Sequence, residues 1–162
     1  MADDRTGERA VNITVPEIEK FLSGLIGPVG NPHTMAVELG AARKMAKAVE
    51  DDDPIHYDAE AAIKRGYRGV VAPWPLLWLF YFNAEEHRID FPFGKATVHG
   101  EDEYEFHEPM IAGDEITLRM AITDARLKQG RSGQLGLVVE ERRFTNQRGD
   151  LCAVLRTTII RR

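Results

Sequence analysis

The chain has 162 residues, of which 43% are hydrophobic and 29% are charged, and its formal net charge at pH 7 is -5. This length predicts a single domain over residues 1–162 whose core needs no disulfide or metal to hold it. The excess of acidic residues argues against nucleic acid or an anionic membrane as the main partner. The only cysteine, Cys152, lies in the apolar run 151–155. That setting favours a buried hydrophobic side chain over a nucleophile.

The N-terminal segment, residues 1–10, is polar and charged and contains no apolar stretch. Such a composition predicts disorder and is not that of a signal peptide. The longest apolar run, residues 74–82, is about half as long as a helix that crosses a bilayer. We therefore expect a soluble protein of the cytoplasm, which also suits the absence of disulfides.

The first half of the chain has the patterns of helices and loops. Residues 15–26 carry apolar side chains at helical spacing, whereas residues 27–32 include two prolines and two glycines and predict a loop. Residues 35–49 predict a second helix, which should end before Pro54 because the residue before a proline disfavours helix. Residues 58–64 predict one or two further helical turns.

The run of residues 76–82 is apolar on every side, as expected of a fully buried helix or a central strand. Prolines precede this run, and polar residues that continue its length follow it. Both features favour a buried helix from Pro75 to about Glu86.

After residue 95 the apolar residues alternate, which is typical of strands. The turn residues 146–149 predict that the last two strands pair as a hairpin. Helices followed by antiparallel strands predict the α+β class. The expected strand segments are residues 103–106, 114–122, 136–144 and 151–160.

An aspartate and a histidine, Asp51 and His56, stand five residues apart across a turn that Pro54 restrains. Around one water molecule, a carboxylate and an imidazole form a general acid/base pair. The carboxylate can also set the tautomer of the imidazole. The same spacing suits an acidic loop at a helix end whose histidine only caps or packs, so the spacing alone leaves both interpretations open.

Residues 49–62 resemble the signature of the (R)-specific enoyl-CoA hydratases of the MaoC-like family. That signature reads Gly-Asp-x-Asn-Pro-apolar-His, followed by a small residue, and Asp51 and His56 stand at its aspartate and histidine. Two positions differ from it. Glu50 replaces the glycine and adds a side chain where the backbone is tight. Asp53 replaces the asparagine and adds a negative charge beside Asp51, which should raise the pKa of one of the two.

Residues 61–73, 99–109 and 111–114 resemble the FAS1-like dehydratase branch of the same family. The resemblance implies a hot-dog fold, in which an antiparallel β-sheet wraps around a central buried helix. It implies hydration of trans-2-enoyl thioesters to (R)-3-hydroxyacyl thioesters, or the reverse dehydration, without a cofactor. In this family Asp51 and His56 would hold and activate the water.

The resemblance also implies where the substrate binds. A backbone N–H near the start of the central helix would stabilise the enolate oxygen of the thioester. Because proline has no N–H, the donor would be that of Ala72, Trp74 or Leu76. The candidate substrate-binding residues are Ala72, Trp74 and Trp78. We expect no metal, since the histidines do not have the spacing of metal ligands.

The implied partners are an acyl-CoA or acyl-carrier-protein thioester and a second hot-dog subunit, in a homodimer or a heterodimer. Two other functions remain. One is a non-catalytic acyl-binding subunit of a heteromeric dehydratase, which Glu50 and Asp53 favour and His56 opposes. The other is an acyl-CoA thioesterase, an activity that recurs on this fold.

The remaining histidines and a group of basic residues have simpler interpretations. His33 should be exposed in a loop, and His87 should lie at the C-terminus of the central helix. His99 and His107 flank one strand and should lie on its surface, although they could face a partner's pocket. The basic residues predict either a solvated strand face or contacts with phosphates. They are Arg126, Lys128, Arg131, Arg142 and Arg143.

Overall fold

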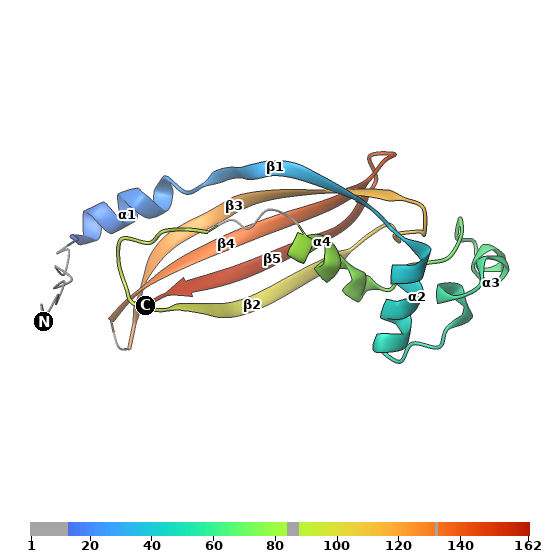
Figure 1. Cartoon of the computed structure of the whole chain (residues 1–162). Helices are drawn as coiled ribbons and strands as arrows, with labels where there is room; N and C mark the ends of the chain where they lie inside the picture. Colours follow the sequence, from blue (N-terminus) through green and yellow to red (C-terminus); the bar gives the residue numbers. More distant parts are fainter. Residues whose placement is uncertain (1–12, 84–87, 132) are drawn as a thin grey trace, which may run out of the picture.

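The computed structural model describes residues 13–83, 88–131 and 133–162. Its elements divide into a helical first half, which contains one strand, and a second half made of four long strands (Figure 1). In chain order they are α1 (Val15–Ser23), β1 (Gly27–Ala36), α2 (Leu39–Ala48), the 3-10 helix η1 (Pro54–His56), α3 (Ala59–Lys64), the 3-10 helix η2 (Trp74–Leu76), α4 (Leu77–Asn83), β2 (Thr97–Phe106), β3 (Glu115–Gly130), β4 (Gly133–Asn146) and β5 (Leu151–Arg161).

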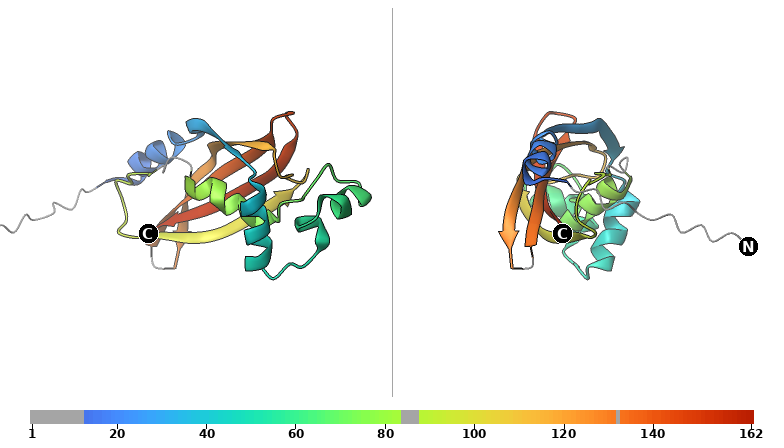
Figure 2. Two further views of the ribbon diagram at one scale, coloured as in Figure 1. Left: turned by 45° about the vertical axis from the view of Figure 1, so that its right-hand side comes forward. Right: turned by 90° about the vertical axis from the view of Figure 1, so that its left-hand side faces the viewer.

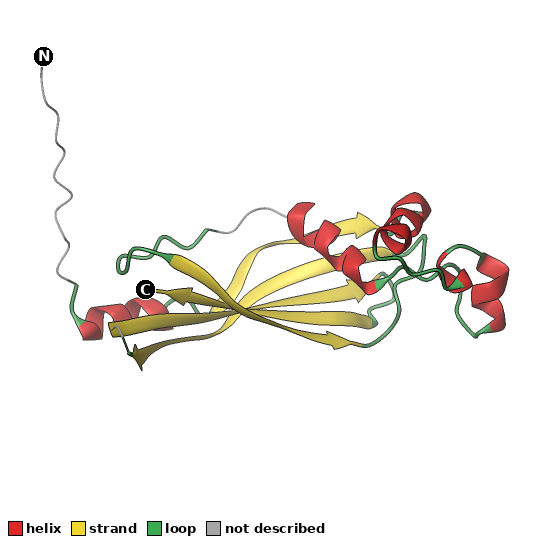
Figure 3. Ribbon diagram, turned by 90° about the horizontal axis from the view of Figure 1, so that it is seen from below, coloured by secondary structure: helices red, strands yellow, loops and turns green. Residues whose placement is uncertain are grey.

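The five strands form one antiparallel sheet in the order β1-β3-β4-β5-β2, so β1 and β2 are its edges. The sheet is curved, and α4 lies across its concave face (Figure 2). Seen from below, α2, η1 and α3 gather beyond one end of the strands (Figure 3). This arrangement confirms the predicted α+β class and the antiparallel sheet around a helix.

The predicted loop at residues 27–32 is wrong, because these residues open β1. The prolines are tolerated since β1 is an edge strand, where a missing N–H donor need not leave an acceptor unpaired. The register with β3 shifts between Val29 and His33, and Gly30 has a φ of 63°, so an irregular stretch takes up the two prolines. His33 is half-buried on this strand and not exposed in a loop, which corrects the expectation for it.

Two helix boundaries also differ from the prediction. The first helix ends at Ser23 and not at residue 26, because the chain turns at Gly24 toward β1. The second helix begins at Leu39 and not at Met35. Met35 pairs with Ile116 in the β1–β3 ladder. The first residues of the predicted helix therefore belong to strand β1, although their apolar spacing is helical.

The buried helix is confirmed, with its start divided into two parts. Pro75 lies in η2, and α4 begins at Leu77; residues 84–87 of the expected helix, including His87, lie outside the described residues. Phe80 and the other inward side chains of α4 pack on the sheet against Phe144 and Leu155. This cluster is the main core, and it fixes the height of α4 above the sheet.

The hairpin between β4 and β5 is confirmed. The amide oxygen of Asn146 accepts hydrogen bonds from the N–H groups of Arg148 and Asp150, at 2.9 and 3.0 Å, which closes the turn. Cys152 then lies fully buried on β5, and burial raises the pKa of its thiol to about 11. An unreactive core side chain follows, as the apolar run predicted. In the described part of the chain, no helix has the length and apolar character needed to cross a membrane.

Candidate active site

The loop between α2 and α3 carries the predicted aspartate and histidine at one end of the sheet. After α2 the chain reverses at Glu50, whose φ of 57° is the only positive value for a non-glycine among the described residues. This conformation brings the Asp51 N–H to 2.9 Å from the carbonyl oxygen of Ala46. A glycine adopts it without strain, which explains the glycine of the signature. The Glu50 side chain is exposed and leaves the site open.

Asp51 is held by its own loop. The Asp53 N–H donates to Asp51 Oδ1 over 3.0 Å, and the Tyr57 hydroxyl donates to the Asp51 carbonyl oxygen over 2.8 Å. The second carboxylate oxygen, Oδ2, faces His56. With 43% of its side chain exposed, Asp51 is fixed in direction and still open to water and substrate.

His56 is buried, with 8% of its side chain exposed, and both ring nitrogens have a neighbour. Nδ1 lies 2.7 Å from the carbonyl oxygen of Val71. Because a carbonyl oxygen only accepts, Nδ1 carries a hydrogen, and the neutral ring has its lone pair on Nε2. Nε2 lies 3.2 Å from Asp51 Oδ2. The two side chains therefore meet at one point, as the spacing and the resemblance suggested.

Asp53 caps η1 and does not act on Asp51 as a free charge. Its Oδ1 accepts from the Ile55 N–H at 3.2 Å, and its Oδ2 lies 2.5 Å from Nη1 of Arg65. The Ile55 N–H and the Arg65 guanidinium lower the pKa of Asp53 below its ordinary value. The pKa of Asp53 is therefore lowered and not raised. The sequence did not indicate Arg65, which lies 12 residues away, as the partner of this carboxylate.

A cleft of about 600 Å³ lies in front of the pair and extends to the start of η2. It includes two of the three predicted substrate-binding residues, Ala72 and Trp74. The third, Trp78, is outside this lining and packs against the rings of Tyr81 and Tyr104. The cleft is lined by Val49, Asp51, Asp53, Ile55, His56, Tyr67, Val71, Ala72, Pro73, Trp74, Pro75, His107 and Pro109.

The three candidate oxyanion donors differ in their hydrogen bonds. The Ala72 N–H donates to the Met110 carbonyl oxygen at 2.8 Å, and the Leu76 N–H donates to that of Pro73 at 3.0 Å. Among the described residues, no acceptor is bonded to the Trp74 N–H. Of the three, Trp74 therefore has the backbone donor that a ligand in the cleft can use.

Sequence reasoning missed two side chains of the cleft, Tyr67 and His107. His107 follows β2, is 41% exposed, and lies 3.6 Å from Glu105. It is on the strand surface, as predicted, and at the edge of the cleft as well. Nothing in the local sequence indicates this position, because it depends on the packing of β2 beside η2. Within the described ranges, no group of three or more His, Cys, Asp or Glu side chains is arranged to hold a metal ion.

The basic residues divide between the two faces of the sheet. Arg126, Lys128, Arg131 and Arg143 are exposed, in agreement with a solvated surface. Arg142 is 4% exposed and points to the concave face, where it pairs with Glu140. The alternation along β4 separates it from its neighbour Arg143.

Known proteins resemble this chain in sequence. A UPF0336 protein of Saccharopolyspora erythraea is 33% identical over 105 residues, which cover 61% of this chain and 67% of that protein. A UPF0336 protein of Mycobacterium tuberculosis is 26% identical over 132 residues, covering 79% of this chain and 81% of the relative.

Solved structures share the fold. The truncated HadBC (3R)-hydroxyacyl-ACP dehydratase complex of Mycobacterium tuberculosis is 25% identical, with a TM-score of 0.61 over 83% of this chain and 93% of that chain. The (R)-hydratase PhaJ1 of Pseudomonas aeruginosa is 19% identical, with a TM-score of 0.64 over 89% and 85%. The ChsH1-ChsH2 complex of Mycobacterium tuberculosis is 17% identical, with a TM-score of 0.74 over 91% and 92%. These neighbours confirm the hot-dog fold.

The family model described as the FAS1-like, dehydratase domain region matches residues 24–154. That match spans most of the sheet, the central helix and the loop with Asp51 and His56. The chain therefore belongs to the FAS1-like dehydratase family of MaoC-like hot-dog proteins.

Proposed function

We propose that this chain is an (R)-specific enoyl-thioester hydratase, or in reverse a 3-hydroxyacyl-thioester dehydratase, acting on acyl-CoA or acyl-carrier-protein substrates. One observation carries the proposal. Nε2 of His56 and Oδ2 of Asp51 lie 3.2 Å apart at the wall of a cleft, with Nδ1 fixed by Val71. A water in the cleft that bridges these two atoms from the side can donate one hydrogen to the imidazole nitrogen, which is the base, and the other to the carboxylate oxygen.

In the hydration direction, Nε2 of His56 takes a proton from this water as its oxygen bonds to C3 of the enoyl group. The electron pair of the C2–C3 double bond moves toward the thioester carbonyl and forms an enolate. The proton held on Nε2 then passes to C2, which returns the imidazole to its starting form. Asp51 orients the water and stabilises the imidazolium that exists between the two steps.

The Trp74 N–H is the proposed donor to the enolate oxygen. Trp74 is one of the residues that line the cleft, and in the described part of the chain no acceptor competes for its N–H. A backbone donor aimed at developing negative charge is a large contribution to transition-state stabilisation. The similarity to HadBC, a (3R)-hydroxyacyl-ACP dehydratase at 25% identity, supports the same reaction class.

The test is the loss of absorbance of the conjugated enoyl thioester, with crotonyl-CoA and longer enoyl-CoAs, for the purified protein and two variants. We expect Asp51→Asn and His56→Ala to lower kcat/KM by a factor of about 100 to 10,000. Asp52→Asn is the matched control, because Asp52 is exposed and lies outside the cleft lining. A folded protein without hydratase activity on any CoA or carrier-protein substrate would contradict the proposal.

A second candidate is the non-catalytic partner subunit. Two of the structural neighbours, HadBC and ChsH1-ChsH2, are heteromeric complexes of hot-dog chains. If this chain plays the same part, it would be inactive alone, and activity would appear only with a second hot-dog protein. His56→Ala would then leave the activity of the complex unchanged. A thioesterase differs from both in releasing free thiol from an acyl-CoA.

A further inference from the structure

A row of aromatic side chains leads away from the cleft along the concave face. Trp74 lines the cleft and stacks on Phe106 of β2, with ring centroids 4.3 Å apart. Phe106 stacks on Tyr104 at 5.8 Å, and Tyr104 meets the Trp78 ring at 6.5 Å. We name these four residues the aromatic row: Trp74, Phe106, Tyr104 and Trp78. Phe106 is 48% exposed and the other three are half-buried, so the row begins at the cleft and is most open at Phe106.

The same face turns polar one step further along the strands. Asp102, two residues from Tyr104 on β2, pairs with Thr157 on β5, and Thr157 pairs with Glu140 on β4. The Thr157 hydroxyl donates to Asp102 Oδ1 at 2.8 Å. Arg142 donates to Glu140 Oε2 at 2.5 Å and contacts the Thr157 hydroxyl at 3.4 Å. We name these four residues the polar band: Asp102, Thr157, Glu140 and Arg142.

The polar band is mostly buried. Asp102 is its most exposed member, with 18% of its side chain exposed and its Oδ2 3.2 Å from His99 Nε2. Glu140 and Arg142 are each 4% exposed and Thr157 is 8% exposed. From α4, the Tyr81 ring lies 4.5 Å from the guanidinium carbon of Arg142, which ties the helix to the band. A buried pair of this kind resists separation, because removing one partner leaves a charge without compensation.

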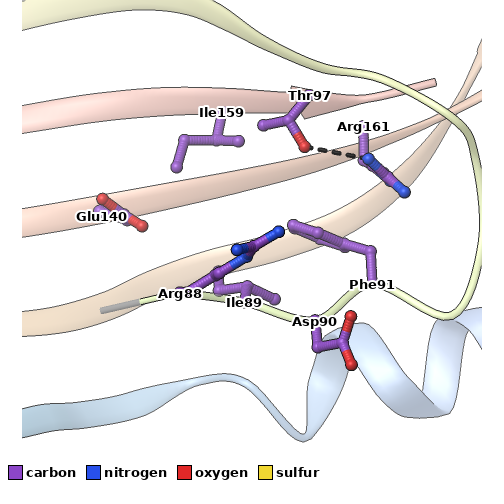
Figure 4. Close-up of a pocket in the computed structure, with 8 residues that line it drawn as sticks. All are labelled: Arg88, Ile89, Asp90, Phe91, Thr97, Glu140, Ile159 and Arg161. Atoms are coloured by element: carbon purple, nitrogen blue, oxygen red, sulfur yellow. Dashed lines mark hydrogen bonds between the residues drawn. The ribbon is translucent and has the colours of Figure 1, made fainter. Parts of the chain in front are cut away.

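Beyond the band the face carries further charges. Glu140 also lines a pocket of about 360 Å³ together with Arg88, Asp90 and Arg161. In Figure 4, Glu140 lies on its strand across from the loop that carries Arg88 and Asp90. The Arg161 guanidinium donates a hydrogen bond to the Thr97 hydroxyl over 3.1 Å. Ile89, Phe91 and Ile159 also line this pocket, so an apolar chain that crossed the band would reach a lining of mixed charged and apolar side chains.

We propose that the polar band ends the acyl-binding surface, so that the protein selects acyl groups of medium length. This inference rests on the proposed function, since it extends the substrate class of the same site. An alkyl chain that passed the band would separate Arg142 from Glu140 or Thr157 from Asp102 without replacing their hydrogen bonds. From Phe106 to Asp102 the strand spans about 13 Å, which is the length of a medium alkyl chain.

The experiment measures kcat/KM for a series of trans-2-enoyl-CoAs, namely crotonyl, octenoyl, dodecenoyl and hexadecenoyl. For the natural chain we expect kcat/KM for octenoyl-CoA to exceed kcat/KM for hexadecenoyl-CoA by about tenfold or more. The test variant is Glu140→Leu/Arg142→Met, since replacing both members of a buried ion pair by apolar residues preserves folding. In this double variant, the ratio of kcat/KM for octenoyl-CoA to kcat/KM for hexadecenoyl-CoA should fall by about tenfold.

The control is Glu141→Leu/Arg143→Met on the opposite face of the same strand, which removes the Glu141–Arg143 pair of 3.4 Å and also the contact of Glu141 with Arg156 at 2.8 Å. Its ratio of octenoyl-CoA to hexadecenoyl-CoA should equal that of the natural chain. Thr157→Val is a second test variant, of the same shape, in case the double variant does not fold; it should shift the ratio in the same direction. An unchanged ratio in a folded test variant would overturn the proposal.

The same proteins are also titrated with saturated octanoyl-CoA and palmitoyl-CoA, and binding is followed by calorimetry. This arm separates the two proposals, because binding needs no catalysis. If no enoyl-CoA is hydrated, the proposed function fails. The polar band is still supported as the end of the acyl surface if the natural chain binds palmitoyl-CoA more weakly than octanoyl-CoA and Glu140→Leu/Arg142→Met binds palmitoyl-CoA more tightly than the natural chain does. Equal binding of octanoyl-CoA and palmitoyl-CoA by the natural chain would overturn the proposal that the polar band ends the acyl-binding surface.

Discussion

His56 donates its Nδ1–H to the carbonyl oxygen of Val71 over 2.7 Å, and the Val71 N–H donates to the carbonyl oxygen of Ile55 over 2.9 Å. The segment that leads to η2 is thereby joined to the loop that carries Asp51 and His56 by two hydrogen bonds around one side chain. Val71 contributes only backbone atoms to this link, so the tautomer of His56 is set by the fold.

A direct consequence is the position of the ring proton. In the neutral form, His56 should carry its hydrogen on Nδ1, and its Nε2 should have the shift of an unprotonated nitrogen in a long-range ¹H–¹⁵N correlation spectrum. The exposed His99 and His107 provide reference signals in the same sample. A neutral His56 with its hydrogen on Nε2 would be incompatible with the bond to Val71.

Glu50→Gly should stabilise the protein. A side chain in the left-handed conformation, here at a φ of 57°, costs about 1 to 2 kcal/mol, and glycine removes that cost while losing more conformational entropy on folding. We expect a net gain of about 1 kcal/mol in the free energy of unfolding, measured by urea denaturation. Lys47→Gly, in the last turn of α2, should have the opposite sign. A loss of stability in Glu50→Gly would show that the Glu50 side chain has a favourable role.

Asp53→Asn restores the residue of the family signature and should leave hydration nearly unchanged. An asparagine oxygen can still accept from the Ile55 N–H and cap η1. What is lost is the ion pair with Arg65, whose side chain is 54% exposed, and an exposed pair contributes about 1 kcal/mol or less. Urea unfolding and kcat/KM together test this. A large loss of activity would assign the Asp53 charge a part in the reaction.

Asp114 should be the carboxylate on which the fold depends most. It is 2% exposed and accepts both Arg68 nitrogens, at 3.1 and 2.7 Å, as well as the Ile111 N–H at 3.0 Å. Asp114→Asn should lower the free energy of unfolding at pH 7 by about 1 to 3 kcal/mol, because the amide nitrogen that replaces one buried carboxylate oxygen cannot accept a hydrogen bond, while the 47% exposed Arg68 side chain remains solvated. Asp150→Asn is the control, since that carboxylate is 43% exposed, and it should cost about 1 kcal/mol or less.

The same contacts predict a pH dependence. Burial acts to raise the pKa of Asp114, but the hydrogen bonds from Arg68 and from the Ile111 N–H outweigh it, so the pKa is lowered. The stability that ionised Asp114 contributes is complete above the pKa of an unfolded aspartate, about 3.9, and is lost as the pH falls through the lower pKa of the folded state. The difference between the natural chain and Asp114→Asn should therefore narrow below about pH 4. A constant difference down to acid unfolding would contradict this assignment.

The sequence predicted those parts of the molecule that depend on local pattern. The buried helix, the four later strands and the β4–β5 turn follow from apolar periodicity and turn residues. All of them are present, although β2 begins about six residues earlier and β3 ends about eight residues later than expected. β1 was missed because its strand character comes from pairing with β3, which overrides the local effect of its prolines and glycines. The proximity of Asp51 and His56 could be predicted because both lie in one short motif.

The rest of the site depends on contacts between distant segments. The partner of Asp53, the fixed ring of His56 and the position of His107 involve residues 12 or more positions away or a neighbouring element. Arg142 also could not be distinguished from Arg143 in the sequence. The two side chains lie on opposite faces of the sheet because they are adjacent residues of one strand. Composition grouped both with the surface charges, whereas the fold buries one of them.

The two edges of the sheet are unequal in what they offer to another polypeptide. Pro28 and Pro32 remove two N–H donors from β1, and its irregular stretch breaks the even spacing that an added strand would need. β2 contains no proline, and its one irregularity lies near its start, between His99 and Glu101. β2 is therefore the edge with the longer regular stretch, and it carries Tyr104 and Phe106 of the aromatic row.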